Sequence, residues 1–235
     1  MRLFLALSLA LLSCTASAKE ALRVNQNRAV AIDTEISRNM GAVQARLLTL
    51  AADKSGEAVD IVLDSPGGSV FSGFQFVNAM EEVKGQGVRI RCFVNGLAAS
   101  MAFQILVHCD ERYALSRSFL LWHGVRTQSR EPITSRSAAA LHADLAAIDK
   151  VILAELRETL GLKEEELLFH FNQETLHIGD NLGALCPNFI TIRRYIPGIG
   201  EALANPKVVK TSQTQGFEFL FNSSDGDITY TYRGK

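Results

Sequence analysis

A serine between a strand-like run and an apolar run is the first residue that could do chemistry. Residues 95–101 read Asn-Gly-Leu-Ala-Ala-Ser-Met, follow an alternating run at 88–94 and precede an apolar run typical of a buried helix. The small residues allow a sharp turn that places Ser100 at a helix N-terminus, where free amides and the helix dipole favour developing negative charge. An ordinary N-cap serine, worth about 1 kcal/mol, fits the same position, so Ser100 needs support from elsewhere in the chain.

A Pro-Gly-Gly loop and a histidine could complete such a site. Residues 64–69 read Asp-Ser-Pro-Gly-Gly-Ser after an apolar strand, and the missing side chains of Gly67 and Gly68 let backbone amides approach an oxyanion. His123 closes an apolar strand at 119–123, at the sheet edge where active-site groups collect. Taken singly, the loop also fits an ordinary turn, and His123 fits a capping or core histidine.

The elements that must position these residues alternate between strands and helices. Strands are expected at 28–36, 58–63 and 88–94, separated by amphipathic helices at 39–52 and 71–83. This alternation predicts an α/β fold with parallel strands and right-handed crossovers. Further along we expect strands at 113–115, 119–123 and 190–195, helices at 135–160 and 163–171, a loop-like segment at 196–206, and a hairpin at 216–232 turning at 223–226.

The N-terminus reads as an export signal. Met1-Arg2 precedes an apolar run at 3–12 and an Ala-Ser-Ala site at 16–18, which is typical of a secretory signal peptide over residues 1–18. The run is too short for a stable transmembrane anchor. We expect a periplasmic protein released after Ala18; the alternative is a lipoprotein anchored through Cys14, because Leu-Leu-Ser-Cys at 11–14 resembles a lipobox.

Composition limits the remaining possibilities. The 235 residues, with 47% hydrophobic content and a net charge of −1, suit one α/β domain and give no sign of a nucleic-acid partner. We expect a catalytic domain at 19–190 and a β-rich extension at 191–235. Removal of the leader leaves Cys92, Cys109 and Cys186, so at most one internal disulfide forms and its pairing stays open. Their spacing fits no zinc site, and no phosphate-binding loop is present, so we expect neither metal nor cofactor.

Together these pieces resemble the Clp protease proteolytic subunit superfamily, which has the crotonase-like fold of repeated β-β-α or βαβ units. The resemblance runs from about residue 28 to residue 186. It depends on four motifs in order, which are Ser-Pro-Gly-Gly-Ser at 65–69, Gly-Leu-Ala-Ala-Ser-Met at 96–101, Arg-Tyr-Ala-Leu-Ser at 112–116, and His123 after an apolar strand.

The resemblance implies a role for each motif. Ser100 would be the nucleophile and His123 its general base, while the amides of Gly68 and Met101 would form the oxyanion hole. A serine hydroxyl is a weak nucleophile until an adjacent base takes its proton. Each well-placed amide would stabilise the transition state by about 3 kcal/mol. The implied activity is that of a serine-type endopeptidase.

The acidic residue that orients the histidine in this family has no Asp counterpart here. The corresponding stretch, 171–177, reads Phe-Asn-Gln-Glu-Thr-Leu-His, so Glu174 is the expected orienting residue, with Asn172 and Asp180 as alternatives. The loop after His123 also departs from the cytosolic pattern. With an export signal and no periplasmic ATP, we expect ATP-independent cleavage of short or unfolded polypeptides, without an ATPase partner.

Two other functions share this fold. A non-catalytic binding or scaffold member fits the weak acidic position, and a crotonase-type acyl-CoA enzyme would use a similar oxyanion hole. Ser100 with His123, and an exported location without a coenzyme A pool, favour the peptidase. The resemblance also places residues 135–160 where related subunits stack or form rings, although their alanine-rich face would equally suit packing within one subunit. A homo-oligomer therefore stays open.

Overall fold

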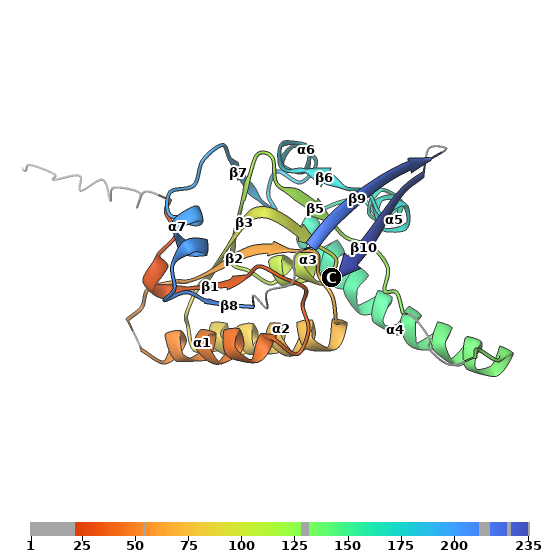
Figure 1. Ribbon diagram of the computed structural model, residues 1–235, viewed down its shortest axis with the longest axis horizontal. Coiled ribbons are helices and arrows are strands. Elements are labelled where there is room, and N and C mark those ends of the chain that lie inside the picture. The colour runs from red at the N-terminus through yellow and green to blue at the C-terminus, as the bar shows by residue number, and fades with distance from the viewer. Residues whose placement is uncertain (1–21, 54, 128–131, 212–216, 225–226, 235) are drawn as a thin grey trace, which may run out of the picture.

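A mostly parallel sheet forms the centre of the molecule (Figure 1). The computed structural model describes residues 22–53, 55–127, 132–211, 217–224 and 227–234. Within these ranges the strand order is β6-β5-β3-β2-β1-β8, and β4 pairs with β3 and β7. The strands are β1 (Ala29–Ile32), β2 (Val59–Ser65), β3 (Ile90–Ala99), β4 (Glu111–Leu115), β5 (Phe119–Leu121), β6 (His177–Ile178), β7 (Thr191–Arg193) and β8 (Val209–Lys210). This confirms the predicted α/β fold.

Both faces of the sheet are buried along β1, which explains why this strand is apolar throughout. Along β1, Val30 and Ile32 belong to one hydrophobic cluster, while Ala29 and Ala31 belong to the other. Successive side chains of a strand point to opposite faces, so β1 contributes to both clusters. Only β6 pairs antiparallel, with β5, among the strand pairs described in this sheet.

Helices cover the two faces unequally. α1 (Met40–Ala52) and α2 (Val70–Gly85) lie together along one side of the sheet (Figure 1). The short helix α7 (Ile199–Ala204) covers the opposite cluster, where Ile199 and Ala202 are buried. The remaining helical elements are η1 (Gln26–Arg28), α3 (Met101–Val107), α4 (Ser135–Leu160), α5 (Glu164–Gln173) and α6 (Gly179–Leu185).

The prediction of a loop over 196–206 was wrong, because α7 lies within it. Gly198 begins this helix in the left-handed conformation, with φ of 86°. Six residues are too few to show a helical period in the sequence. Burial of two apolar side chains against the sheet stabilises a helix that would be marginal alone.

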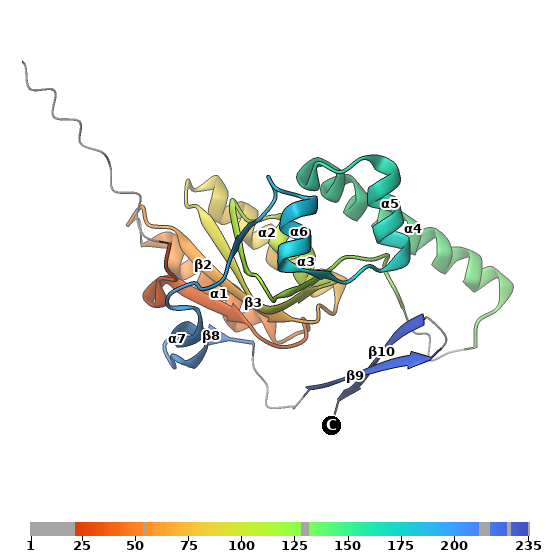
Figure 2. The same cartoon turned by 90° about the horizontal axis from the view of Figure 1, so that it is seen from above.

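α4 has capping residues at both ends, but only its second half packs against the rest of the molecule. Thr134 and Ser137 form a capping box at its start, and Gly161 ends it in the left-handed conformation. The first half projects from the rest of the molecule in both views (Figures 1 and 2), and the first buried side chain is that of Ile152. The alanine-rich face is exposed at Ala138, Ala139, Ala140, Ala143, Ala146 and Ala147. It therefore does not pack against the described part of this chain.

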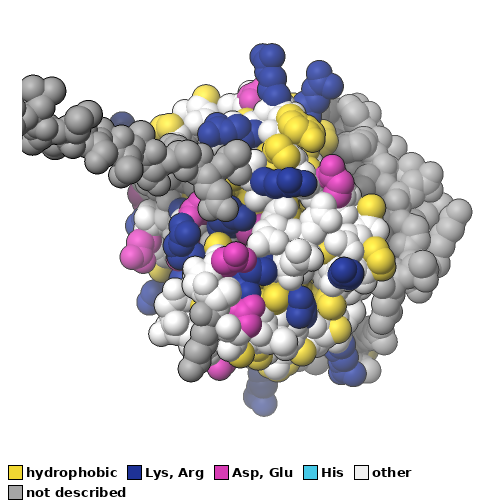
Figure 3. Space-filling view, turned by 90° about the vertical axis from the view of Figure 1, so that its left-hand side faces the viewer, with side chains coloured by type: hydrophobic (Ala, Val, Ile, Leu, Met, Phe, Trp, Pro, Cys, Tyr) yellow, Lys and Arg dark blue, Asp and Glu magenta, His cyan; other side chains and the backbone are white. Residues whose placement is uncertain are grey.

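The C-terminal part adds to the main sheet before it forms a second one. β7 and β8 pair with β4 and β1, and β9 (Phe217–Ser224) then pairs antiparallel with β10 (Asp227–Gly234), where a hairpin was expected. The domain boundary at 190 stays a prediction, and the expected leader at 1–18 lies outside the described residues. On the face beside α7, basic, acidic and apolar side chains are intermixed (Figure 3). Within the described ranges, no helix is long and apolar enough to cross a membrane.

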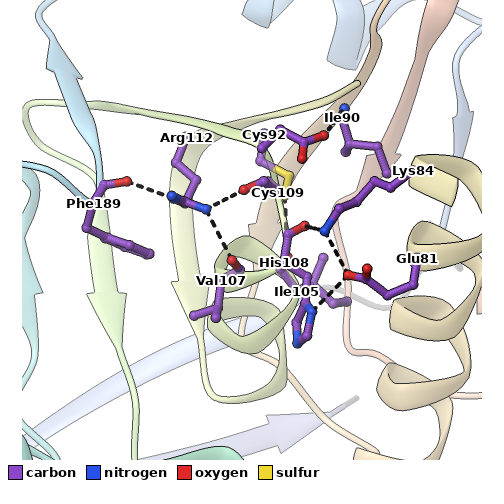
Figure 4. Close-up of a disulfide and its surroundings, with 11 residues drawn as sticks. Glu81, Lys84, Ile90, Cys92, Ile105, Val107, His108, Cys109, Arg112 and Phe189 are labelled. Atoms are coloured by element: carbon purple, nitrogen blue, oxygen red, sulfur yellow. Dashed lines mark hydrogen bonds and ion pairs between the residues drawn. A yellow bond between two sulfur atoms is a disulfide. The ribbon is translucent and has the colours of Figure 1, made fainter. Parts of the chain in front are cut away.

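A disulfide connects β3 to the end of α3 (Figure 4). It joins Cys92 and Cys109, which are 17 residues apart, and leaves Cys186 as a buried thiol. Beside it, the Arg112 guanidinium donates to the Val107 carbonyl at 3.1 Å, near the C-terminal end of α3. The pairing that the sequence left open thus encloses the strand, the Ser100 turn and the helix in one covalent loop.

Candidate active site

Ser100 occupies a strained turn between β3 and α3. Its φ of 55° and ψ of −124° lie where few residues other than glycine are found. The Ser100 amide donates to the Leu121 carbonyl at 2.9 Å, and the Ser100 carbonyl accepts from the amides of Phe103 and Gln104. Strain of this kind persists where the surroundings enforce it, and it is concentrated at functional sites. The buried helix α3 and strand β5 enforce it here.

The Pro-Gly-Gly loop lies directly against this turn. A Cβ on Gly67 would be 2.5 Å from the Ala99 carbonyl oxygen and 2.8 Å from the Met101 amide nitrogen. Gly67 also has a φ of 92°, which a residue with a side chain adopts only under strain. Glycine is therefore required at position 67 both by the backbone conformation and by the lack of space for a side chain.

Two hydrogen bonds hold the loop to the segment after β1. The Ile36 amide donates to the Gly67 carbonyl at 2.7 Å, and the Ser69 amide donates to the Ile36 carbonyl at 2.8 Å. The Gly68 amide lies between these bonds and has no acceptor among the described residues, and neither does the Met101 amide at the start of α3. Both amides are thus available for an oxyanion, the role expected for them.

His123 follows β5 and is held as a neutral base. Its Nδ1 lies 2.6 Å from the Gly124 carbonyl oxygen, which can only accept, so Nδ1 carries the proton and Nε2 is the free acceptor. Burial lowers the pKa of His123, and the charge of Arg126 lowers it further, while the Gly124 carbonyl and the charge of Asp149 oppose this effect. A general base near pH 7 requires this protonation state.

One cavity of about 170 Å³ contains most of the expected site. Its lining includes Ser100, His123, Gly68 and Met101, and its apolar wall is formed by Val70, Trp122, Val125 and Ile152. Ser100 and His123 follow the ends of two adjacent parallel strands, because Ala99 lies opposite Leu121 in the register of β3 and β5. No hydrogen bond joins their side chains in the described structure. In enzymes without substrate such bonds are often long, and they shorten when substrate binds.

Glu174 lies at the edge of this arrangement. It ends α5 in the left-handed conformation, with φ of 51°, and its carboxylate forms an ion pair with Arg126, which lines the cavity. The described contacts include no hydrogen bond from Glu174, Asn172 or Asp180 to His123. The role of Glu174 as the orienting residue therefore stays a prediction.

Asp149, a carboxylate on α4, was not among the residues predicted from the sequence. Its Oδ1 accepts a hydrogen bond from the Val125 amide at 2.7 Å, two residues after His123. The helical pattern of residues 135–160 gave no sign that the second half of α4 lies beside the site. No group of three or more His, Cys, Asp or Glu that could hold a metal ion is found in the described ranges.

A serine on a strained strand-to-helix turn, a neutral histidine from the next strand and two free amides are the parts that serine hydrolases use. A comparison with known families matches residues 15–167 to the Clp protease family, so the matched region contains Ser100 and His123 and ends before Glu174. The chain belongs to the Clp protease family.

Individual relatives agree with this assignment at modest identity. The ATP-dependent Clp protease proteolytic subunit of Porphyromonas gingivalis is 30% identical over 146 residues, which are 61% of this chain and 57% of that protein. The ATP-dependent Clp protease proteolytic subunit 2 of Bacillus licheniformis is 33% identical over 116 residues, 46% of this chain and 60% of that protein. The chain thus spans about three fifths of the length of these relatives.

Proposed function

We propose that this protein is an exported serine endopeptidase that hydrolyses short or unfolded polypeptides without ATP. The observation that carries the proposal is the shared cavity, in which Ser100 in its strained turn meets His123 and the free amides of Gly68 and Met101. The two relatives are named as proteolytic subunits, which supports the same reaction class.

The chemistry follows from this arrangement. The free Nε2 of His123 takes the proton of the Ser100 hydroxyl as its oxygen attacks the peptide carbonyl carbon. The amides of Gly68 and Met101 stabilise the negative oxygen of the tetrahedral intermediate. The imidazolium returns the proton to the leaving amine, which breaks the peptide bond and leaves an acyl group on Ser100. A water molecule, deprotonated by the same histidine, then releases the acyl group.

Export is supported by the disulfide as well as by the N-terminal pattern. Disulfides form and persist in oxidising compartments such as the periplasm and are rare in the cytosol, so the Cys92–Cys109 bond fits a periplasmic protein. The periplasm has no ATP supply for an unfoldase. The substrates that suit this location are chains that need no unfolding.

A homo-oligomer forms part of the proposal. The exposed alanine face of α4 lies on the half of the helix that projects from the body in Figures 1 and 2. Small side chains permit close approach of a second helix. The family resemblance suggests subunit contacts on this helix, and the exposure of its projecting half supports the proposal.

Peptide cleavage by the purified mature chain tests the proposed function. We expect hydrolysis of fluorogenic peptides and of an unfolded protein such as reduced casein without ATP. Ser100→Ala should abolish both activities while its melting temperature stays close to that of the wild type. Equal cleavage by Ser100→Ala would contradict the assignment of Ser100 as the nucleophile, and cleavage only with ATP and an unfoldase would contradict ATP independence.

A further inference from the structure

Asp149 acts on the same peptide group that His123 contacts. The Gly124 carbonyl accepts from Nδ1–H of His123 at 2.6 Å, and the Val125 amide donates to Asp149 Oδ1 at 2.7 Å. The carbonyl of Gly124 and the amide of Val125 belong to one peptide bond. A continuous chain of hydrogen bonds therefore runs from the carboxylate, through this peptide group, to the imidazole.

We propose that Asp149 is the positioning residue of His123, acting through the peptide group between Gly124 and Val125. This rests on the proposed function, in which His123 is the general base. The carboxylate fixes the orientation of the peptide, and the peptide oxygen fixes the imidazole with its proton on Nδ1. In a direct Ser-His-acid triad the carboxylate accepts a hydrogen bond from the imidazole itself. Here a peptide group lies between the imidazole and the carboxylate.

The negative charge of Asp149 also strengthens the series of hydrogen bonds that leads to His123. A carboxylate on the N–H end of a peptide polarises the group, so its oxygen becomes a better acceptor for Nδ1–H. The same charge favours the imidazolium that forms when Ser100 is deprotonated. Asp149 acts on His123 in this sense, since its charge raises the histidine pKa.

The Asp149 carboxylate also packs closely against the backbone at Gly124. A Cβ on Gly124 would lie 3.4 Å from Asp149 Oδ2 and 3.3 Å from the Phe171 ring. The small residue at 124 allows the turn to fit between α4 and α5. Both carboxylate oxygens thus face the two residues that follow His123.

Further contacts hold α4 at this position. Ile152, one turn beyond Asp149, lines the cavity, and Glu155 accepts a hydrogen bond from the side chain of Gln104 on α3. Residues 149, 152 and 155 recur every three positions, so they share one face of the helix. The position of Asp149 is therefore set by a docked helix face.

The other charged groups near His123 do not offer an equivalent contact. Arg126 lowers the histidine pKa, and Glu174 forms its ion pair with Arg126. The described structure shows no hydrogen bond from either side chain to the imidazole or to the Gly124–Val125 peptide group. Asp149 is the carboxylate whose hydrogen bonds lead to Nδ1.

Asp149→Asn tests the proposal with little change in shape. The amide oxygen can still accept from the Val125 amide, but the charge is lost. We expect the pKa of His123, followed by NMR of its ring in the intact chain, to fall by roughly half a unit to one unit. The acid limb of kcat/KM should move by the same amount, and kcat should fall about tenfold. Asp149→Ala, which also removes the acceptor, should lower kcat further.

Asp144→Asn is the matched control, because Asp144 lies on the same helix and is exposed. It should leave the titration and kcat unchanged. A His123 titration in Asp149→Asn that coincides with the wild type would overturn the proposal, whether or not Asp149→Ala folds. The NMR titration needs no turnover. An altered His123 pKa in a chain that cleaves nothing would reject the proposed function and keep the link between Asp149 and His123.

Discussion

Gly67 lies directly beneath Ser100, so close that a Cβ on Gly67 would be 2.7 Å from the Ser100 Cβ. Real Cβ atoms do not approach other atoms this closely, so a side chain at 67 must displace the serine turn or its own loop. The two strained segments of the site thus support each other. Ser100 has a positive φ of 55° and Gly67 one of 92°.

We therefore expect Gly67→Ala to lower both catalytic activity and stability. Displacement of a nucleophile by about 1 Å can lower the rate about 10²-fold, and we expect a loss of that order in kcat. Gly87→Ala is the matched control, because Gly87 has a similar φ of 82° and a Cβ added to it would meet nothing within 4 Å. Gly87→Ala should lose about 1–2 kcal/mol of stability from the positive φ. Gly67→Ala should lose more, because its Cβ also overlaps backbone atoms of the serine turn. Equal kcat values for the two variants would contradict the close packing.

The sequence predicted the central fold because its strands and helices have clear periods and ends. β1, β2 and α4 appear where the apolar patterns placed them. α7 could not be predicted from its six residues, because contact with the sheet stabilises it. The continuation of β3 through Ala99 also depends on pairing with β5, which no local pattern contains.

The residues that the sequence motifs singled out lie together, while their catalytic roles stay predictions. Gly68, Ser100, Met101 and His123 meet in one cavity, because adjacent parallel strands end at the same edge of the sheet. The surroundings of the histidine depend on how distant helices pack. That packing places Asp149 next to the Gly124–Val125 peptide, and it leaves Glu174 with Arg126.

Glu174→Gln distinguishes the role of the Glu174 carboxylate from that of the Asp149 carboxylate. Because the Glu174 carboxylate is bound to Arg126, we expect kcat to fall less than about tenfold, with a similar change in Arg126→Gln. Steady-state kinetics of both single variants and of the double variant measure this, and the double variant should resemble either single one. A loss in Glu174→Gln near the 10⁴-fold scale of direct triads would show that Glu174 orients His123, and would contradict our assignment of Asp149.

The disulfide should contribute measurably to stability. Its loop of 17 residues predicts about 3 kcal/mol, so the double variant with Cys92→Ala and Cys109→Ala should melt roughly 6–12 °C below the wild type. A reductant should lower the melting temperature of the wild type, and it should have no effect on the double variant. Cys186→Ala controls for the loss of a buried thiol and should keep the full response to reductant. A double variant as stable as the wild type would contradict this contribution.

His177 predicts loss of stability in mild acid. Its ring stacks on Trp122 with centroids 4.6 Å apart, and burial, aided by the charge of His170, lowers its pKa to about 4. The unfolded chain, with a histidine pKa of about 6.5, then binds more protons than the folded chain between these values. Stability is therefore complete above about pH 6.5 and falls as the pH approaches 4, by at most about 1.4 kcal/mol per pH unit.

Urea denaturation of the wild type and of His177→Phe between pH 4 and pH 7 measures this contribution. The variant keeps a ring against Trp122 but cannot be protonated at this position. Its stability should fall less steeply, and the difference between the two curves isolates His177 from carboxylates that titrate in the same range. Parallel curves would show that His177 does not resist protonation in the folded protein.

The most direct measurement of the central claim is labelling of the purified mature chain with a fluorophosphonate, followed by mass-spectrometric location of the adduct. A serine activated by a neutral histidine and flanked by free amides should react, so we predict a single adduct on Ser100. We also predict that Ser100→Ala is unlabelled while it stays folded, and that His123→Ala is labelled far more slowly. An adduct on Ser65, Ser69 or Ser116, or no adduct on a folded wild-type chain, would contradict the assignment of Ser100 as the nucleophile.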